Sequence, residues 1–123
     1  MRKTGTMVEP AHLAEKLKLF SEHWSPRIVS EYNGNEVMVV KIQGAFPWHK
    51  HDSTDDFFYV LKGKMRLETE QGNVEMGPGD LYVVPKGVMH RPVADEEVHL
   101  MLIEPRGEPN SGDPATAATK VWI

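Results

Sequence analysis

The sequence predicts an all-β fold, a small barrel of the jelly-roll kind, with one short helix near the N-terminus. From Gly44 onward, short apolar runs are separated by turns rich in Gly, Pro, Asn and Asp, at spacings of about 8 to 12 residues. Nothing after Trp24 has the apolar period of a helix. Many short strands in a chain of 123 residues favour a β-sandwich or barrel, of which the jelly roll is the small version.

The helix is expected between Pro10 and Trp24. Leu13, Leu17 and Phe20 recur there at helical spacing, with charged and polar residues between them. Proline is suited to the first turn of a helix, where its missing N–H is not needed. The pattern therefore predicts a short amphipathic helix packed on the outside of the main fold.

Two strands are expected directly after this helix, within residues 25–44. Asn33-Gly34 is a strong signal for a tight hairpin turn between two strands. The barrel core should extend over about residues 28–104, with later strands at 57–61, 65–69, 81–84 and 98–103. The terminal "KVWI" could close as a short edge strand or pair with another subunit.

Length and composition favour one ordinary globular domain over residues 1–123. The net charge is −4 and there is no basic run, which argues against binding to nucleic acid or to an anionic membrane. No apolar run is long enough to cross a bilayer, and the basic N-terminus lacks the apolar segment of a signal peptide. The chain has no cysteine, so a cytoplasmic location is expected and a metal could be held only by His, carboxylate or water.

Two histidines at spacing two are the first sign of chemistry. His49 and His51 precede a strand, and residues i and i+2 of an extended chain point to the same side. Two imidazoles side by side are either surface groups or metal ligands. The rest of the pattern decides between these alternatives.

That rest consists of two blocks of fixed spacing. In the first, His51 is followed by Asp56 after four residues and by Gly63 after six more; in the second, Gly79 leads through "PKGVMH" to His90. The blocks resemble the two motifs of the cupin superfamily, in which H-x-H, an acidic residue and a glycine are followed by G-x5-P-x-G-x2-H. The surrounding chain is similar to small single-domain cupins often labelled mannose-6-phosphate-isomerase-like.

The resemblance implies that His49, His51, Asp56 and His90 converge inside the barrel and hold a divalent metal ion, namely Zn, Mn, Fe, Ni or Co. The sequence departs from the motif at the acidic position, where an aspartate replaces the glutamate. Asp55 is an alternative ligand at that position, and neither aspartate needs to coordinate. The distance to Gly63 favours Asp56.

For function, the resemblance implies a metal-dependent enzyme acting on a small oxygenated molecule, of isomerase or dioxygenase type. The alternative is a non-catalytic cupin that binds a metal or a small ligand. Once the ligands are assigned, no further acid or base is expected to face the pocket, and no catalytic residue is assigned. A phosphosugar isomerase is disfavoured because the pocket lacks an identifiable cluster of Arg or Lys.

A homodimer is expected from the strand that follows Asp56. Phe57, Tyr59 and Leu61 alternate with the inward residues and should therefore face away from the core. Such an apolar stripe is costly to leave in water, and a second copy of the chain would cover it.

Overall fold

The computed structural model describes residues 9–123. The first eight residues lie outside the described residues. The prediction that the N-terminal stretch is not a signal peptide falls mostly on them. The described elements are α1 (Leu13–Leu17), β1 (Arg27–Tyr32), β2 (Asn35–Ala45), β3 (Asp56–Lys62), β4 (Met65–Thr69), β5 (Gly72–Met76), β6 (Leu81–Val84), β7 (His90–Pro105) and β8 (Val121–Trp122). The all-β fold with one short helix is confirmed.

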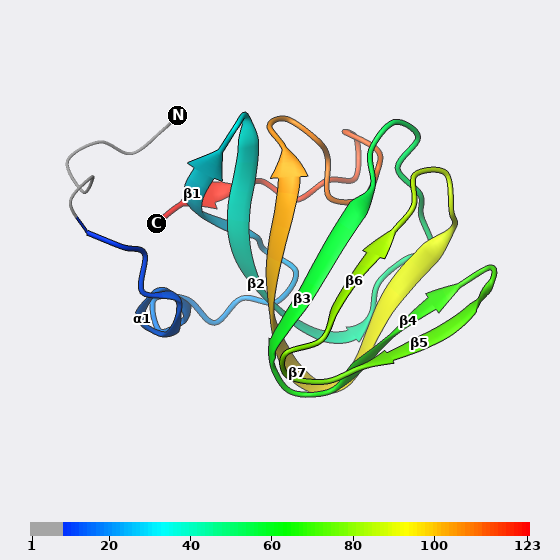
Figure 1. The fold of residues 1–123 in the computed structure, drawn as a ribbon, viewed down its shortest axis with the longest axis horizontal. Coiled ribbons are helices and arrows are strands. Elements are labelled where there is room, and N and C mark those ends of the chain that lie inside the picture. The colour runs from blue at the N-terminus through cyan, green and yellow to red at the C-terminus, as the bar shows by residue number, and fades with distance from the viewer. Residues whose placement is uncertain (1–8) are drawn as a thin grey trace.

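Two long antiparallel strands, β2 and β7, form the spine of the barrel. They pair from Asn35 opposite Pro105 to Ala45 opposite Val93, with a shift of register between Ile42 and Gly44. The other edge of β7 pairs with β4 near its start and with β3 near its end. Because β7 is shared in this way, the sheet curves round. Its two ends are formed by β5 with β4 and by β1 with β8, and β3 and β6 lie between the end of β7 and the β4–β5 hairpin, as Figure 1 shows.

The predicted hairpin joins β1 and β2. Tyr32 pairs with Asn35, and the two residues between them both have positive φ, 49° at Asn33 and 78° at Gly34. Positive φ at both central positions is the geometry that matches the right-handed twist of a two-residue hairpin, and Asn-Gly tolerates it best.

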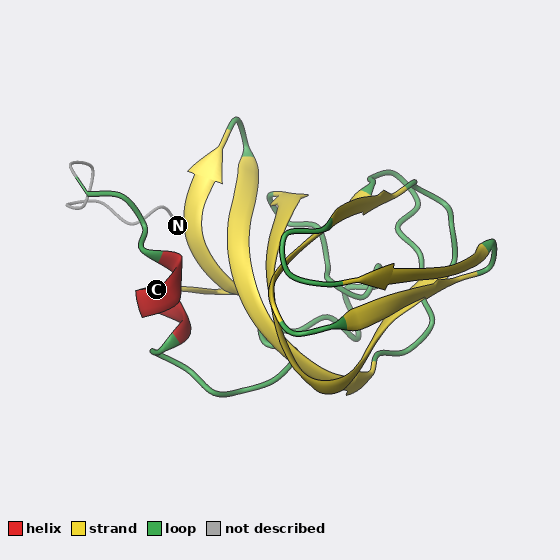
Figure 2. Ribbon diagram, turned by 60° about the horizontal axis from the view of Figure 1, so that its bottom comes forward, coloured by secondary structure: helices red, strands yellow, loops and turns green. Residues whose placement is uncertain are grey.

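The helix is shorter than the sequence predicts. It ends at Leu17, and Phe20 lies beyond it, buried in a small cluster with Leu17 and Val39 of β2. The backbone carbonyl of Phe20 accepts a hydrogen bond from Nζ of Lys41 in β2 (2.6 Å), which connects this segment to the sheet. The helix does lie outside the barrel, as predicted (Figure 2). Within residues 9–123 the structure has no helix that is long and apolar enough to cross a membrane.

The core fills the interior of the barrel, and β3 shows how the sequence places it. Asp56, Phe58 and Val60 are buried, while the intervening Phe57 and Tyr59 are only half-buried. This is the alternation expected of a strand with one face inward. The direction of each side chain in this strand is as predicted, and Asp56 is the one acid on its buried face.

The two observations behind the predicted homodimer are weaker in the structure. Leu61 packs against the cluster beneath the helix, so the outward stripe is partly covered by the chain itself. Val121 and Trp122 pair in parallel with Arg27 and Ile28 of the same chain, which is the edge-strand alternative for the terminal segment. The homodimer stays a prediction.

Candidate metal centre

The two histidine blocks are brought together by their backbones. His49 and His90 exchange a pair of hydrogen bonds, from His49 N to His90 O (3.0 Å) and from His90 N to His49 O (2.9 Å). The turn before His90 is fixed in the same way, because the N–H of Gly87 donates to the carbonyl of His51 (2.8 Å). Gly87 has a φ of 82°, which glycine adopts without strain. The segments from both motifs therefore meet at one end of the barrel.

The carboxylate comes from the first residue of β3. Asp56 is 5% exposed and faces the histidines from across the barrel. Asp55 points elsewhere: its Oδ1 accepts a hydrogen bond from the backbone N–H of Lys86 (3.0 Å) at an exposed position. The structure thus brings Asp56, and not Asp55, into the cluster.

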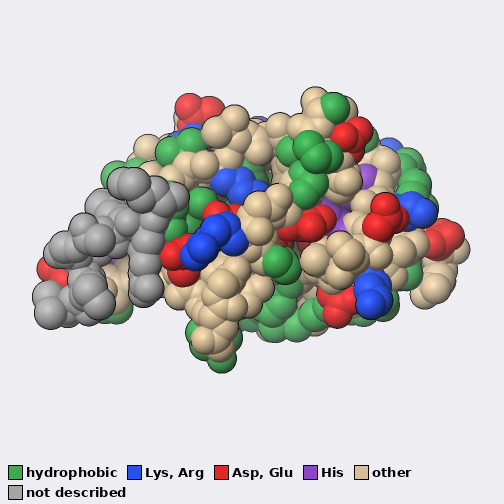
Figure 3. Space-filling model, turned by 90° about the horizontal axis from the view of Figure 1, so that it is seen from above, with side chains coloured by type: hydrophobic (Ala, Val, Ile, Leu, Met, Phe, Trp, Pro, Cys, Tyr) green, Lys and Arg blue, Asp and Glu red, His purple; other side chains and the backbone are tan. Residues whose placement is uncertain are grey.

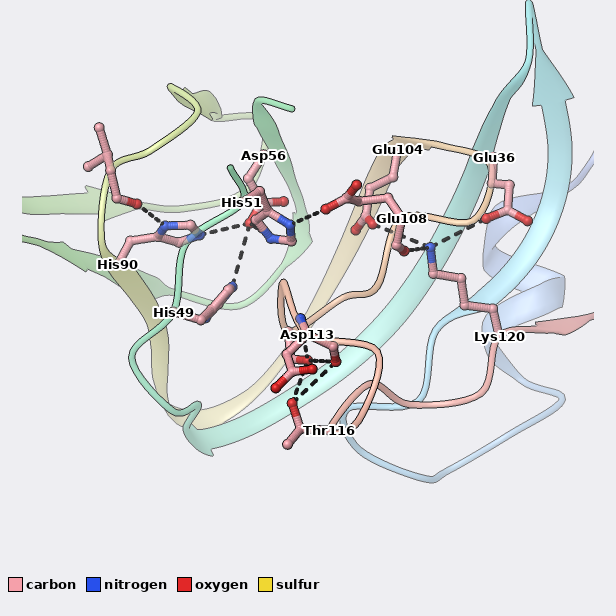
Figure 4. Close-up of polar contacts among 12 residues, drawn as sticks. Glu36, His49, His51, Asp56, His90, Glu104, Glu108, Asp113, Thr116 and Lys120 are labelled. Carbon is pink, nitrogen blue, oxygen red and sulfur yellow. Dashed lines mark hydrogen bonds and ion pairs between the residues drawn. The ribbon is translucent and has the colours of Figure 1, made fainter. Parts of the chain in front are cut away.

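Three imidazole nitrogens face one carboxylate oxygen (Figure 4). Oδ2 of Asp56 lies 2.8 Å from Nε2 of His90, 3.3 Å from Nε2 of His51 and 3.9 Å from Nε2 of His49. One donor atom from each of the four residues lies within 4.8 Å of every other. Two ligand atoms that share an ion at about 2.1 Å are roughly 3 to 4 Å apart, so the spacing suits a single metal ion.

The second nitrogen of each ring is held from outside the cluster. Nδ1 lies close to a backbone carbonyl in His49 and in His90 and to a carboxylate in His51: Pro47 O (2.9 Å), Val88 O (2.8 Å) and Glu108 Oε2 (2.8 Å). An acceptor at Nδ1 favours the tautomer with its proton there, which leaves the lone pair of Nε2 facing inward. Metal-binding histidines have this arrangement, in which the outer partner fixes the ring and its tautomer.

One buried nitrogen in the cluster has no hydrogen bond. Nε2 of His51 is inaccessible to solvent and makes none with the described residues, although it lies 3.3 Å from Asp56 Oδ2. A buried polar atom without a partner is costly unless something else satisfies it. A metal ion between the four side chains would do so, and the donor set of three imidazoles and one carboxylate suits borderline divalent metals.

The charges in the cluster are strongly coupled. Burial alone would lower the pKa of His51, but the neighbouring carboxylates of Asp56 and Glu108 outweigh it and raise that pKa to about 9. Burial would likewise raise the pKa of Asp56, but the neighbouring imidazoles of His51 and His90 hold it below its usual range. For His49 burial prevails and lowers the pKa. The cluster therefore favours the ionised form of Asp56, which is stabilised by the imidazoles of His51 and His90.

A cavity of about 40 Å³ opens beside the cluster, with His49 and Asp56 in its wall. Its remaining walls are mainly apolar and include Val40, Ile42, Phe58, Leu100 and Leu102. In the view from above, histidine side chains are visible in a recess flanked by acidic groups (Figure 3). A cavity of this size admits only a small molecule, since one water needs roughly 10 to 15 Å³ of such space.

The sequence-based expectation that no further acid faces this cavity is wrong at Glu104. This residue of β7 lines the same cavity as Asp56 and is 3% exposed. The segment that follows β7 adds two more charged residues to this polar region. Glu108 lies next to Nδ1 of His51, and Lys120 forms an ion pair with Glu104. Strand alternation could have found Glu104, because it shares parity with the buried Leu100 and Leu102. No pattern in the sequence places Glu108 or Lys120, which lie in the irregular C-terminal segment.

Comparison with known proteins agrees with this architecture. Residues 36–104 match the family model described as a cupin domain. The chain is similar in structure to a cupin-2 domain containing protein from Shewanella frigidimarina (40% identity, TM-score 0.79, covering 83% of this chain and 100% of the other). It is also similar to protein NMB1881 from Neisseria meningitidis (32% identity, TM-score 0.70, covering 78% of this chain and 98% of the other).

In sequence, the chain is 30% identical over 64 residues to the protein YdbB of Bacillus subtilis. That match spans 51% of this chain and 57% of YdbB, so it covers little more than half of the relative. The family model covers more than half of the present chain, and it spans the strands that carry Asp56, His90 and Glu104. The chain therefore belongs to the cupin family.

Proposed function

We propose that this cupin is a metal-dependent enzyme that acts on a small oxygenated molecule, with His49, His51, Asp56 and His90 as the ligands of one divalent metal ion. The observation that carries the proposal is the convergence of three Nε2 atoms on one carboxylate oxygen, with each outer Nδ1 next to its own acceptor. Histidines without a metal-binding role do not need this common direction of their Nε2 atoms or a separate acceptor at each Nδ1.

The metal is Zn, Mn, Fe, Ni or Co, all of which accept imidazole and carboxylate ligands. When bound, it would supply a Lewis acid for an oxygen atom of the ligand, or a redox centre if it is iron. Glu108 supports His51 from behind and keeps its Nε2 directed at the site. Residues of this chain therefore provide both the ligands and the groups that orient them.

The residues that line the cavity indicate which kind of molecule fits it. It combines apolar walls with polar groups at two places, His49 and Asp56 at one and Glu104 at another. Such a cavity suits a small molecule with a compact apolar body and an oxygen atom that reaches the metal. None of the residues lining it is Arg or Lys, which argues against a phosphorylated sugar and makes the mannose-6-phosphate-isomerase-like label one of fold.

Two reaction types fit these parts, an isomerase and a dioxygenase. The deciding experiment begins with metal analysis of protein purified without a nickel column. Oxygen uptake is then measured with small diketones. Iron together with oxygen consumption supports a dioxygenase, and a redox-inert metal with turnover supports an isomerase.

The alternative function, a non-catalytic cupin that stores or senses a metal or small ligand, is an outcome of the same experiment. It would be supported by tightly held metal without turnover of any carbonyl or diketone substrate. Protein that contains no metal, and takes up none on dialysis against each of the five ions, would contradict both the enzyme and a cupin that stores or senses a metal.

A further inference from the structure

The cavity has a second polar end besides the candidate metal centre. Glu104 lies in its wall together with Asp56, yet makes no hydrogen bond or ion pair with any of the four candidate ligands among the contacts of the described residues. Leu100 and Leu102, which precede it on the same face of β7, line the cavity between the two strand ends. A carboxyl group in an apolar wall is costly, so its presence calls for a reason.

Lys120 holds Glu104 in place. Its Nζ lies 3.4 Å from Oε2 of Glu104 and 3.4 Å from Oε1 of Glu36, and it donates a hydrogen bond to the backbone carbonyl of Glu108 (Figure 4). One ammonium group thus faces two buried carboxyl groups on the neighbouring strands β2 and β7. Of these two, Glu104 lines the cavity and Glu36 does not.

In the metal-free protein, the surroundings of Glu104 favour the protonated form of its carboxyl group. Burial is the main cause, the charge of Asp56 adds to it, and Lys120 and His51 oppose both; together they raise the pKa of Glu104 to about 7. A group whose pKa is close to neutral pH is the most effective general acid or base there. If the carboxyl group of Glu104 were always ionised, it could form the ion pair with Lys120 but could not donate a proton.

We infer that Glu104 is the proton-transferring residue of this cupin, and that the ligand is a small carbonyl compound with a C–H bond next to its carbonyl group. The inference rests on the proposed function, since it takes the carbonyl oxygen to lie at the metal. The C–H bond breaks, its electron pair moves toward the carbonyl oxygen, and the proton forms an O–H bond on Glu104. Return of a proton from Glu104 to the same carbon restores both the carbonyl compound and the carboxylate, so no oxidant or reductant is needed.

Lys120 is a positioning residue in this account. It fixes the carboxyl of Glu104 in the cavity wall and does not touch the ligand. Glu36 provides a matched control, because it contacts the same Nζ at the same distance but lies outside the cavity. A purely structural role for this network would make Glu36 and Glu104 equivalent.

The test uses Glu104→Gln, Glu36→Gln and the wild type, each loaded with zinc or manganese. Deuterium uptake from D₂O into hydroxyacetone and into pyruvate is followed by proton NMR, with chelator-treated protein as the background. We expect uptake above background in the wild type, most of it kept in Glu36→Gln, and a loss on the order of 100-fold or more in Glu104→Gln. Metal content should be equal in all three.

A second readout does not depend on turnover. Carbon-13 NMR of the carboxyl groups in metal-free protein should show one group that titrates near pH 7, absent from Glu104→Gln and present in Glu36→Gln. The inference is overturned if Glu104→Gln exchanges as fast as the wild type, or if metal-loaded wild type exchanges neither probe. Failure of the proposed function is a different result, namely that the wild type takes up no metal.

Discussion

Nε2 of His90 and Oδ2 of Asp56 lie 2.8 Å apart, although the two residues are 34 positions apart in the chain. Asp56 is the first residue of β3 and His90 is the first residue of β7, so each lies where a strand begins. The same oxygen also faces His49 and His51. A single carboxylate thus connects both histidine blocks, which makes it a sensitive point for substitution.

The first prediction compares the two neighbouring aspartates. Asp56→Ala should weaken metal binding strongly, because it removes the only carboxylate of the cluster, whereas Asp55→Ala should leave it unchanged. Asp55 accepts one hydrogen bond from Lys86 at the surface and contacts none of the histidines in the described contacts. Metal titration of both variants checks this, and loss of metal from Asp55→Ala with retention in Asp56→Ala would reverse the assignment.

The second prediction concerns the partner of His51. Glu108→Gln replaces the carboxylate that lies 2.8 Å from Nδ1 of His51 by a neutral amide, which orients the ring less firmly and makes its Nε2 a weaker donor. We expect metal affinity to fall by roughly 10- to 100-fold, as for other outer partners of metal-binding histidines. Glu75→Gln, at an exposed position of β5, is the control and should bind as the wild type does. Equal affinities in the two variants would show that Glu108 does not support the site.

The third prediction is a pH dependence of stability in metal-free protein. The pKa of Glu104 rises from the usual 4.5 to about 7 on folding, so the folded state binds the proton more tightly than the unfolded state. Stability from this group is therefore fully present below about pH 4.5 and is lost as pH rises to 7, by about 3 kcal/mol in total.

Glu104→Gln removes this loss because a neutral amide does not titrate. The variant should be close to the wild type in stability at pH 5 and more stable at pH 8. Urea denaturation at the two pH values measures the difference. An equal difference between variant and wild type at both values would mean that Glu104 has an ordinary pKa.

The spacing of residues in the sequence accounts for most of the fold and for the four clustered side chains. Alternation placed Asp56 and Phe58 inward, and the distance to Gly63 selected Asp56 over Asp55, as the structure also has it. These succeed because strand geometry is local and nearly invariant. The identity of the fold followed from the resemblance of the two histidine blocks to the motifs of the cupins.

What the sequence did not predict depends on contacts between distant segments. The helix ends at Leu17, and the carbonyl of Phe20 beyond it is bound by Lys41 of β2, a contact that no local pattern encodes. Lys120 reaches Glu104 through a stretch with little regular structure, where no period relates residue number to direction. Glu104 itself obeyed the alternation of its strand but was missed, because acids are rarely fully buried.

The fourth prediction separates two roles of glycine in the barrel. Gly44 and Gly63 both have positive φ, 89° and 87°, but a Cβ at Gly63 would lie 2.8 Å from the carbonyl oxygen of Glu97, whereas one at Gly44 would meet nothing. Gly44→Ala should cost about 1 to 2 kcal/mol from backbone strain alone. Gly63→Ala should cost distinctly more, because backbone has to move. Thermal or urea unfolding compares them, and equal losses would show that β7 yields freely at Glu97.

The central claim is that His49, His51, Asp56 and His90 hold one metal ion, and metal analysis of histidine variants tests it most directly. Wild type, His49→Ala, His90→Ala and, as a control, His99→Ala are purified without a nickel column and dialysed against a trace of each candidate ion. His99 contacts Glu97 outside the cluster, so its variant should keep the metal of the wild type. We expect one bound ion per chain in the wild type and in His99→Ala, and little or none in His49→Ala and His90→Ala. Full metal content in both of the latter variants would contradict it.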